Sequence, residues 1–382
     1  MEQNGFSVNE KKTLKTDGDN PSERIYFPEL DGLRFFAFLL VFIYHHILFS
    51  TIPCLSFLFI NGWIGVDLFF VLSSFLFTKL LIAEYKKNNT ISFKKFYIRR
   101  IFRIWPIYFL SIVFSLSYIF LQHQEISKYI GIRIIGMFTF SDNILSSIYG
   151  FNPMFSVSHL WTISYEEQFY ICIPIIILLL VRSSTKTKVL SLMLTLIVFN
   201  TIKFMLIANH ITKLAILMLP ITRFESIIFG IVMGFGGMDI LLKKINQNIL
   251  SVMSILFFVL ICHIPRYDNI SYWLIVSPLV GMSTSLLTYS VLNTSFFKKV
   301  FTHKVLAFLG KRSYGLYVYH LFCNALANYM IKSIPTIPSS PLASFFYSLS
   351  FTILASIVSY KIIETPFLNW KKKFEVVTSR PI

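Results

Sequence analysis

Residues 33–52 read LRFFAFLLVFIYHHILFSTI, an almost unbroken apolar run. A helix needs about 20 mostly apolar residues to cross the hydrocarbon core of a bilayer, so this run predicts a transmembrane helix. Comparable runs recur along the chain, and we expect ten spans, at 33–52, 62–83, 100–121, 159–181, 188–207, 213–238, 248–264, 271–292, 305–330 and 341–363. The sequence therefore predicts an all-α, polytopic membrane protein of about ten transmembrane helices, with a re-entrant or interfacial helix around 130–140.

The composition agrees with a membrane protein. Of the 382 residues, 55% are hydrophobic, 17% are aromatic and only 14% are charged, whereas a soluble domain carries about 25% charged residues. The net charge is +17, but the basic residues sit in short clusters between apolar runs and not on one solvated face. This spacing argues against nucleic acid as a partner and indicates contact with membrane lipids.

The positions of the basic clusters predict the orientation. With the N-terminus in the cytoplasm, most of the 35 Lys and Arg residues fall in cytoplasmic segments, as the positive-inside rule requires. Both termini are then expected in the cytoplasm, and we expect a multi-pass protein of the cell's inner (cytoplasmic) membrane. We expect a disordered cytoplasmic tail over 1–24, a membrane domain over 25–367 and a cytoplasmic C-terminal tail over 368–382. The four cysteines lie far apart without metal-ligand spacing, so no metal site is expected.

The first span carries an arginine and a histidine on one face. Arg34 and His45 are eleven residues apart, close to three helical turns, so they lie about 16 Å apart along the axis. Arginine binds phosphate by bidentate contacts, and histidine has the pKa range of a general base. A long ligand with phosphates at one end and a reactive group at the other, such as a coenzyme A thioester, would fit between them. The alternative is that Arg34 reaches the membrane interface and His45 forms an ordinary buried hydrogen bond.

A second basic cluster, RRIFRIWP, precedes the apolar part of the third span. Arg100 and Arg103 are three residues apart and share a helix face, so both are candidates for binding further phosphates of the same ligand. The simpler alternative is a cytoplasmic anchor of the kind that the positive-inside rule describes.

A third cluster, HLWTISYEEQFY, marks the expected outer end of the fourth span. Its adjacent carboxylates, Glu166 and Glu167, face different ways, and either is a candidate to bind sugar hydroxyls or move a proton. His159 and Trp161 would lie beside them on the acceptor side. The alternative is a helix start at the interface, where negative charge is favourable.

The motif LGKRSYGLYVYH places three more polar side chains near one helix face. Tyr314, Tyr317 and His320 follow one another at intervals of three residues and run toward the middle of the membrane. They are candidates for substrate binding, and His320 is equally explained as a packing histidine. Three other charged residues are expected to form structural pairs in the interior: Asp67, Arg223 and Glu225.

Taken together, these motifs resemble the membrane acyltransferase 3 family, whose members O-acylate surface polysaccharides and similar acceptors. The matching stretches occur in the family's order over residues 28–367: PELDGLRFFAFLLVFIYHH, GVDLFFVLSSFLF, FYIRRIFRIWPIYFL, HLWTISYEEQFY, RFESIIFGIVMG, LGKRSYGLYVYHLF and IIETPF. Two positions depart from the family's usual pattern, with Ser74 where glycine is common and Tyr165 where valine is common.

The resemblance implies ten spans, acetyl-CoA as the usual donor and transfer across the membrane. It assigns function to an Arg and a His of the first span, here Arg34 and His45. It also assigns function to an Arg-x-x-Arg pair, here Arg100 and Arg103, and to a Glu of the fourth motif. The implied activity is O-acylation of a hydroxyl on a cell-surface polysaccharide or glycan precursor. The alternative function is an exporter of a lipid-linked glycan or small molecule, which explains the spans but not the ordered motifs. The sequence does not predict an oligomeric state.

Overall fold

A computed structural model describes residues 24–50, 52, 55–121, 127–265, 269–334, 336 and 338–379. Within these ranges every regular element is a helix, which confirms the predicted all-α class. The predicted disordered tail, 1–24, lies outside the described residues except for Arg24.

Eleven helices of the described chain have ten or more residues: α1 (Pro28–Tyr44), α3 (Ile64–Asn88), α4 (Phe93–Leu121), α5 (Lys128–Phe138), α7 (Trp161–Leu180), α8 (Thr185–Ala208), α10 (Glu225–Gly234), α12 (Gln247–Cys262), α13 (Tyr272–Asn293), α16 (Ser313–Ser333) and α17 (Pro341–Ser359). Shorter helices connect or flank them: α2 (Ser56–Asn61), α6 (Asp142–Tyr149), α9 (Lys213–Met218), α11 (Asp239–Leu242), α14 (Ser295–Phe301), α15 (Lys304–Lys311) and α18 (Thr365–Lys372). The described chain also contains the short 3-10 helices η2 (Ile47–Ser50), η4 (Phe155–Leu160) and η5 (Pro220–Thr222) and the π-helix η6 (Tyr360–Glu364).

Six helical stretches of the described chain are long and apolar enough to cross a membrane: Ile64–Asn88, Phe93–Leu121, Phe155–Leu180, Thr185–Ala208, Tyr272–Asn293 and Pro341–Lys372. The structure thus shows a multi-pass membrane protein, while the count of ten spans and the orientation of the ends stay predictions. Between α4 and α7, the helices α5 and α6 occupy the region where a re-entrant or interfacial helix was expected.

Several expected spans are not single helices. The predicted span 213–238 is divided into α9, η5 and α10, because Leu219 precedes Pro220 and takes extended backbone angles (φ −81°, ψ 136°). The predicted span 305–330 is interrupted at Arg312, which joins α15 to α16. The first predicted span, 33–52, is shorter as a helix, because α1 ends at Tyr44 and His45 caps it.

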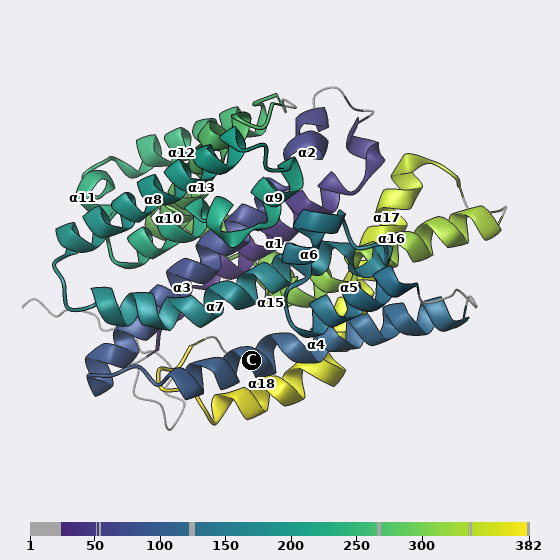
Figure 1. The fold of residues 1–382 in the computed structure, drawn as a ribbon, viewed down its shortest axis with the longest axis horizontal. Helices are drawn as coiled ribbons and strands as arrows, with labels where there is room; N and C mark the ends of the chain where they lie inside the picture. Colours follow the sequence, from purple (N-terminus) through teal and green to yellow (C-terminus); the bar gives the residue numbers. More distant parts are fainter. Residues whose placement is uncertain are drawn as a thin grey trace, which may run out of the picture.

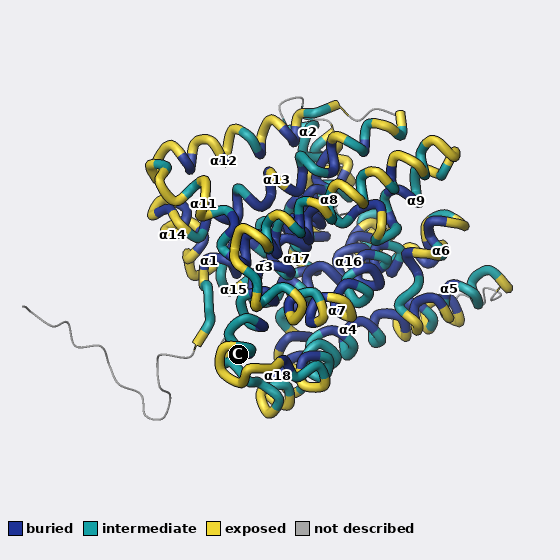
Figure 2. The backbone as a smooth tube through the Cα atoms, turned by 60° about the vertical axis from the view of Figure 1, so that its left-hand side comes forward, coloured by how far each residue is buried: buried dark blue, intermediate teal, exposed yellow. Residues whose placement is uncertain are grey.

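Helix α1 lies in the middle of the molecule, packed against α3, α13, α15 and α16 (Figure 1). Burial differs strongly between the helices. Of an apolar stretch of 18 residues within each helix, 67% is buried in α13 but only 11% in α8. Figure 2 shows the same difference, with exposed residues along α8 and α12 and buried ones around the centre. The exposed residues of α8 include Leu194, Ile197 and Val198, as expected for side chains that face lipid.

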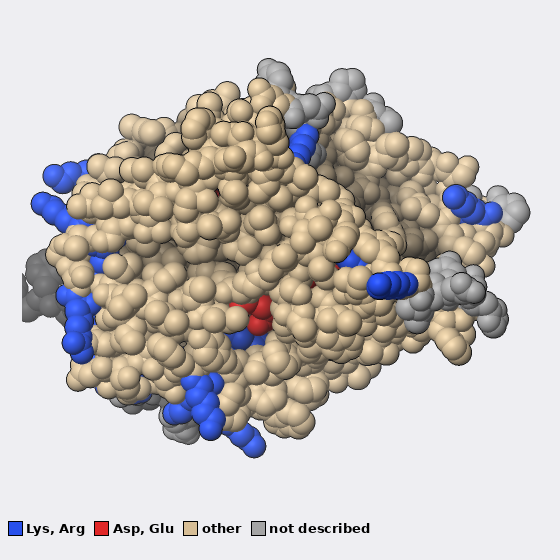
Figure 3. Space-filling model, in the orientation of Figure 1, with Lys and Arg blue, Asp and Glu red and all other residues tan. Residues whose placement is uncertain are grey.

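The surface carries few charges across its middle. In Figure 3, Lys and Arg side chains gather at the ends and lower edge of the face that is drawn, while its broad centre is almost uncharged apart from one small recessed group. Such a surface matches a bilayer, in which unpaired charge is costly and basic residues collect at the membrane boundary.

Two glycines allow helices to approach α1 and α3 closely. A Cβ on Gly310 would lie 1.6 Å from the carbonyl oxygen of Asp31, so α15 reaches α1 only because this side chain is absent. A Cβ on Gly230 would lie 1.9 Å from Oγ of Ser74. Ser74 therefore fits on α3, since Gly230 supplies the room and the serine hydroxyl donates to the Phe70 carbonyl (2.8 Å).

The described part of the predicted C-terminal tail, 368–379, packs against the rest of the protein. Helix α18 lies along α4 at the lower edge of Figure 1. Beyond it, Nη1 of Arg99 donates to the Phe374 carbonyl (2.9 Å), and the Ile25 amide donates to the Thr378 carbonyl (3.0 Å). The apolar side of α18 and these backbone acceptors give the segment partners that the sequence pattern did not reveal.

Candidate active site

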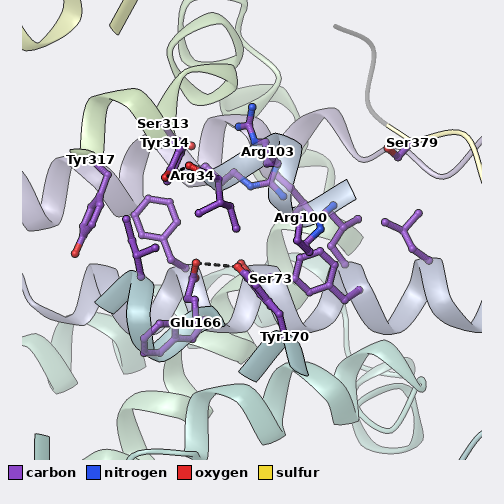
Figure 4. A pocket seen from close by; sticks show the side chains of 18 of the residues that line it. Arg34, Ser73, Arg100, Arg103, Glu166, Tyr170, Ser313, Tyr314, Tyr317 and Ser379 are labelled. Atoms are coloured by element: carbon purple, nitrogen blue, oxygen red, sulfur yellow. Dashed lines mark hydrogen bonds between the residues drawn. The ribbon is translucent and has the colours of Figure 1, made fainter. Parts of the chain in front are cut away.

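A cavity of about 190 Å³ opens between α1, α3, α4, α7 and α16, with α18 at its edge. Five charged side chains line it: Arg34, Arg100, Arg103, Glu166 and Lys371. Aromatic and aliphatic side chains form most of the remaining wall, among them Phe69, Phe70, Phe77, Tyr170, Tyr314 and Tyr317. Figure 4 shows the three arginines together above Glu166. The structure thus brings together the arginines that the sequence placed in two separate spans.

Arg34 is held in place from its own helix. Its Nη1 lies 2.9 Å from Oδ1 of Asp31, one turn earlier, and the Tyr26 hydroxyl donates to the other oxygen of that carboxylate (2.8 Å). The Arg34 side chain is 17% exposed, whereas Asp31 is fully buried. The carboxylate orients the guanidinium, whose outer edge faces the cavity and can bind an anion.

The two arginines of α4 have different surroundings. Nη1 of Arg103 lies 3.1 Å from Oε2 of Glu364, at the end of η6, and the guanidinium lies 5.9 Å from the ring centre of Tyr314. Arg100 lies over the Phe77 ring at 4.5 Å, and its buried Nε has no hydrogen-bond partner in the described part of the chain. A buried guanidinium with an unused donor beside open volume is suited to bind an anionic ligand.

Of the two adjacent carboxylates, the cavity includes Glu166. It accepts a hydrogen bond from the Tyr170 hydroxyl at 2.8 Å, drawn as a dashed line in Figure 4. Glu167 is not part of the described lining, and its Oε1 is buried without a partner among the described residues. Both carboxylates were expected near the outer surface with Trp161. Glu166 instead shares the cavity of the arginines, because the side of α7 that carries it packs on α3.

Three histidines from three helical segments meet at the end of α1. Nδ1 of His45 lies 3.4 Å from Nε2 of His320, with ring centres 5.0 Å apart. The His159 ring centre lies 4.6 Å from that of His320. The carbonyl oxygen of Tyr317 joins two of them, because it lies 2.9 Å from Nε2 of His159 and 2.5 Å from Nδ1 of His320. These residues were predicted on separate spans, and the fold makes them one cluster.

Backbone carbonyls determine which ring nitrogens carry a proton. A carbonyl oxygen only accepts, so a neutral imidazole must present N–H to it. The Tyr317 carbonyl therefore assigns the proton of His320 to Nδ1 and leaves its Nε2 as an acceptor. The Val41 carbonyl, 2.9 Å from Nδ1 of His45, assigns the His45 proton to that nitrogen. The lone pair on Nε2 of His45 remains available to accept a proton, as a general base requires.

The described lining of the cavity includes Tyr317 but not His45. The Tyr317 ring lies near Phe69, its hydroxyl hydrogen-bonds the hydroxyl of Thr162 (2.6 Å), and its ring centre lies 5.6 Å from that of His320, the neighbour of His45. The sequence predicted that one long ligand would fit between Arg34 and His45. The structure shows a cavity that contains Arg34 and reaches Tyr317, with His45 outside its described lining.

The two remaining residues predicted to bind substrate, Trp161 and Tyr314, lie in different places. Trp161 is outside the described lining of the cavity and lies 6.0 Å from the Arg223 guanidinium, with Trp63 at 5.3 Å from the same group. Tyr314 does line the cavity, and its hydroxyl donates to the Ile104 carbonyl (2.7 Å), which fixes its ring beside Arg103.

The expected structural pairing of interior charges is confirmed. Arg223 pairs with Asp67, and Ser226 donates to the same carboxylate (2.8 Å), while Glu225 pairs with Lys203. Tyr165 is fully buried beside this group, and its hydroxyl donates to the Arg223 carbonyl (2.7 Å).

Sequence reasoning missed several polar residues of the cavity, among them Ser73, Thr162, Tyr170 and Lys371. Tyr170 lies one turn after Glu166, a spacing that predicts contact on a helix and was a usable signal. Lys371 stands in a run of three lysines that nothing in the sequence distinguishes from one another.

Comparison with known proteins agrees with these features. A family model described as an acyltransferase domain matches residues 27–361. The protein named "Putative O-acetyltransferase SAR0937" from Staphylococcus aureus (strain MRSA252) is 29% identical over 94% of this chain and 61% of its own length. O-acetyltransferase OatA of S. aureus (strain NCTC 8325 / PS 47) is 28% identical over 93% of this chain and 59% of its own.

The chain thus spans about three-fifths of the length of these relatives. No solved structure matches it. Since the family model covers most of the chain, from the start of α1 to η6, the protein belongs to the acyltransferase 3 family.

Proposed function

We propose that the protein is a membrane O-acyltransferase that moves an acyl group, acetyl in the first instance, from cytoplasmic acyl-CoA to a hydroxyl of a cell-surface glycan or glycan precursor. The observation that supports this most is the cavity that gathers Arg34, Arg100 and Arg103 and reaches Tyr317, near which His45 contacts His320. The O-acetyltransferase names of the relatives support the same reaction class.

In this proposal the phosphates of the donor bind the three arginines, and its acyl end points toward Tyr317. Guanidinium groups suit this role because they stay charged and offer paired donors to phosphate oxygens. A turn of the Tyr317 side chain, which breaks its bond to Thr162, opens the way from the cavity to His45.

His45 then acts as a general base. Its Nε2 takes the proton of the acceptor hydroxyl, and the oxygen attacks the thioester carbon. The carbon–sulfur bond breaks, and the departing thiolate of coenzyme A takes the proton back from His45. A positioned base of this kind contributes about 10²–10⁴-fold to the rate. An acyl group carried briefly on His45 is the alternative course, and isolation of an acyl-histidine would favour it.

The test uses purified full-length protein in vesicles with labelled acetyl-CoA on the cytoplasmic side and glycan extracted from the host on the other. We expect transfer of label by the unaltered protein and a loss of at least about 100-fold in His45→Ala. His46→Ala is the matched control, because His46 is the neighbouring buried histidine and packs on Phe42, with ring centres 4.4 Å apart.

Two outcomes would reject the proposal. One is full transfer by folded His45→Ala, and the other is movement of glycan across the membrane without transfer of label, which would indicate an exporter. Mass spectrometry of surface glycans with and without the gene identifies the acceptor by its loss of acetyl mass.

A further inference from the structure

We propose that Lys371 forms a separate subsite for the phosphate at the nucleotide end of the donor, so that the protein selects coenzyme A thioesters that carry the 3′-phosphate. This inference rests on the proposed function. Lys371 lies outside residues 27–361, the part of the chain that the family model matches.

Lys371 belongs to the cavity, whereas its neighbours do not. It is one of the lining residues, its side chain is 12% exposed, and its ammonium lies 3.2 Å from Oε1 of Glu375. The next two lysines, Lys372 and Lys373, are exposed and absent from the described lining. If these lysines only anchored the chain at the membrane surface, all three would be exposed. Instead, Lys371 lines the cavity.

The segment that carries Lys371 is fixed against the rest of the protein at several points. Helix α18 packs on α4, the helix of Arg100 and Arg103. The Phe374 carbonyl accepts from Arg99 (2.9 Å), and the Ser379 carbonyl accepts from Nε of Arg24 (3.1 Å). Lys371 is therefore placed by tertiary contacts, as a specific binding residue must be.

The order of residues along the cavity indicates which part of the donor Lys371 meets. In Figure 4, Tyr317 lies at one end of the labelled side chains and Ser379 at the other, with the arginines between them. The acyl end of the donor must lie toward Tyr317, because the histidine cluster that contains His45 lies next to it. The diphosphate in the middle of coenzyme A then reaches the arginines, and the ribose 3′-phosphate reaches the end marked by Ser379. Lys371 lines the cavity from the same C-terminal segment as Ser379.

The chemistry of the two groups fits. A terminal phosphate is a compact dianion, and a lysine ammonium offers a point charge with three rotatable donors. Glu375 holds the ammonium in position through a one-turn contact on the same segment. Because both side chains keep some exposure, a phosphate can reach the ammonium without full burial of a new charge.

The experiment compares acetyl-CoA with acetyl-3′-dephospho-CoA for the unaltered protein, Lys371→Gln and the matched control Lys372→Gln. We expect the unaltered protein and the control to have a KM about tenfold lower for acetyl-CoA than for the dephospho donor. Lys371→Gln should remove this preference by raising only the KM for acetyl-CoA. Lys371→Arg should keep most of it. A preference that survives unchanged in Lys371→Gln overturns the inference.

A second measurement does not depend on acyl transfer. Free coenzyme A should raise the thermal unfolding midpoint of the purified protein more than 3′-dephospho-CoA does, and Lys371→Gln should make the two equal. Equal shifts in the unaltered protein reject the subsite even where transfer occurs. An unequal shift without any transfer rejects the proposed reaction but keeps the subsite.

Phosphatidylglycerol added to phosphatidylcholine vesicles tests a lipid headgroup as the occupant. We expect no effect on the preference for the 3′-phosphate. If the unaltered protein loses this preference when the anionic lipid is added, Lys371 binds a lipid headgroup and the inference is overturned.

Discussion

Two groups of charged side chains are buried in this helix bundle, and they differ in what surrounds them. The cavity group consists of Arg34, Arg100, Arg103, Glu166 and Lys371, which share one open volume. The closed group consists of Asp67, Lys203, Arg223 and Glu225, between α3, α8 and α10. Both groups satisfy the usual criterion for function in a membrane, ionisable residues away from water.

The closed group consists of two acids and two bases that pair with each other. Arg223 contacts Asp67, Lys203 contacts Glu225, and each of these side chains is at most 7% exposed. Each group has a buried polar atom without a partner among the described residues, Nε of Arg100 and Oε2 of Glu225, and the cavity group differs because all of its members face about 190 Å³ of open volume. Buried charge alone is therefore a weak sign of a site, and buried charge beside open volume is a strong one.

The largest expected effect breaks the closed group. Arg223→Gln leaves the Asp67 carboxylate buried without its partner, which costs about 3–5 kcal/mol of folding free energy. We expect a large fall in the thermal unfolding midpoint in detergent, and the double variant Asp67→Asn, Arg223→Gln should recover most of it. A single variant as stable as the unaltered protein would show that this pair does not hold the bundle together.

The second effect tests the cavity group. Arg100→Gln should raise the KM for acetyl-CoA about 30-fold, because hydrogen bonds to charged groups contribute about 1.5–3 kcal/mol, while the unfolding midpoint stays unchanged. Lys95→Gln is the control, since Lys95 is exposed on the same helix and outside the described lining. A loss of stability in Arg100→Gln with an unchanged KM would show that Arg100 stabilises the fold and does not bind the donor.

The third effect concerns the histidines behind the cavity. His320→Leu removes the acceptor 3.4 Å from Nδ1 of His45 but leaves the Val41 carbonyl. We expect kcat to fall about fivefold, the loss of one net hydrogen bond, with an unchanged KM for acetyl-CoA. Steady-state kinetics in vesicles separate the two constants. A change in KM alone would place His320 in donor binding instead.

The smallest expected effect is the response of the cavity group and the closed group to ionic strength. Raising the ionic strength from about 0.05 M to 0.5 M shortens the Debye length about threefold, so the KM for the donor should rise about threefold. The unfolding midpoint should not fall, because the closed group is buried and weakly screened. A constant KM with a falling midpoint would reverse the assignment of the two groups.

Much of the fold could be predicted from the sequence, because long apolar runs have few alternatives in a membrane. The interruptions within the predicted spans were harder to predict. The proline that divides the sixth predicted span, Pro220, was visible in the sequence, but the apolar run around it favoured one continuous helix. Hydrophobicity measures where a chain prefers to lie and does not record a local change of backbone angle.

The site was predictable in part. The residues Arg34, Arg100 and Arg103 follow from motifs, and the structure places them together. The position of Glu166 depends on which neighbour α7 faces, and the inward turn of Lys371 depends on how α18 packs on α4. Both are tertiary facts that no local pattern contains.

The contact between Ile25 and Thr378 joins the two ends of the described chain beside the cavity. Lys371 and Ser379 are translated after the long apolar helices of the described chain, so the lining of the cavity is complete only once residue 379 has been made. A nascent chain stopped inside 365–379 would hold those helices and still lack one wall of the cavity.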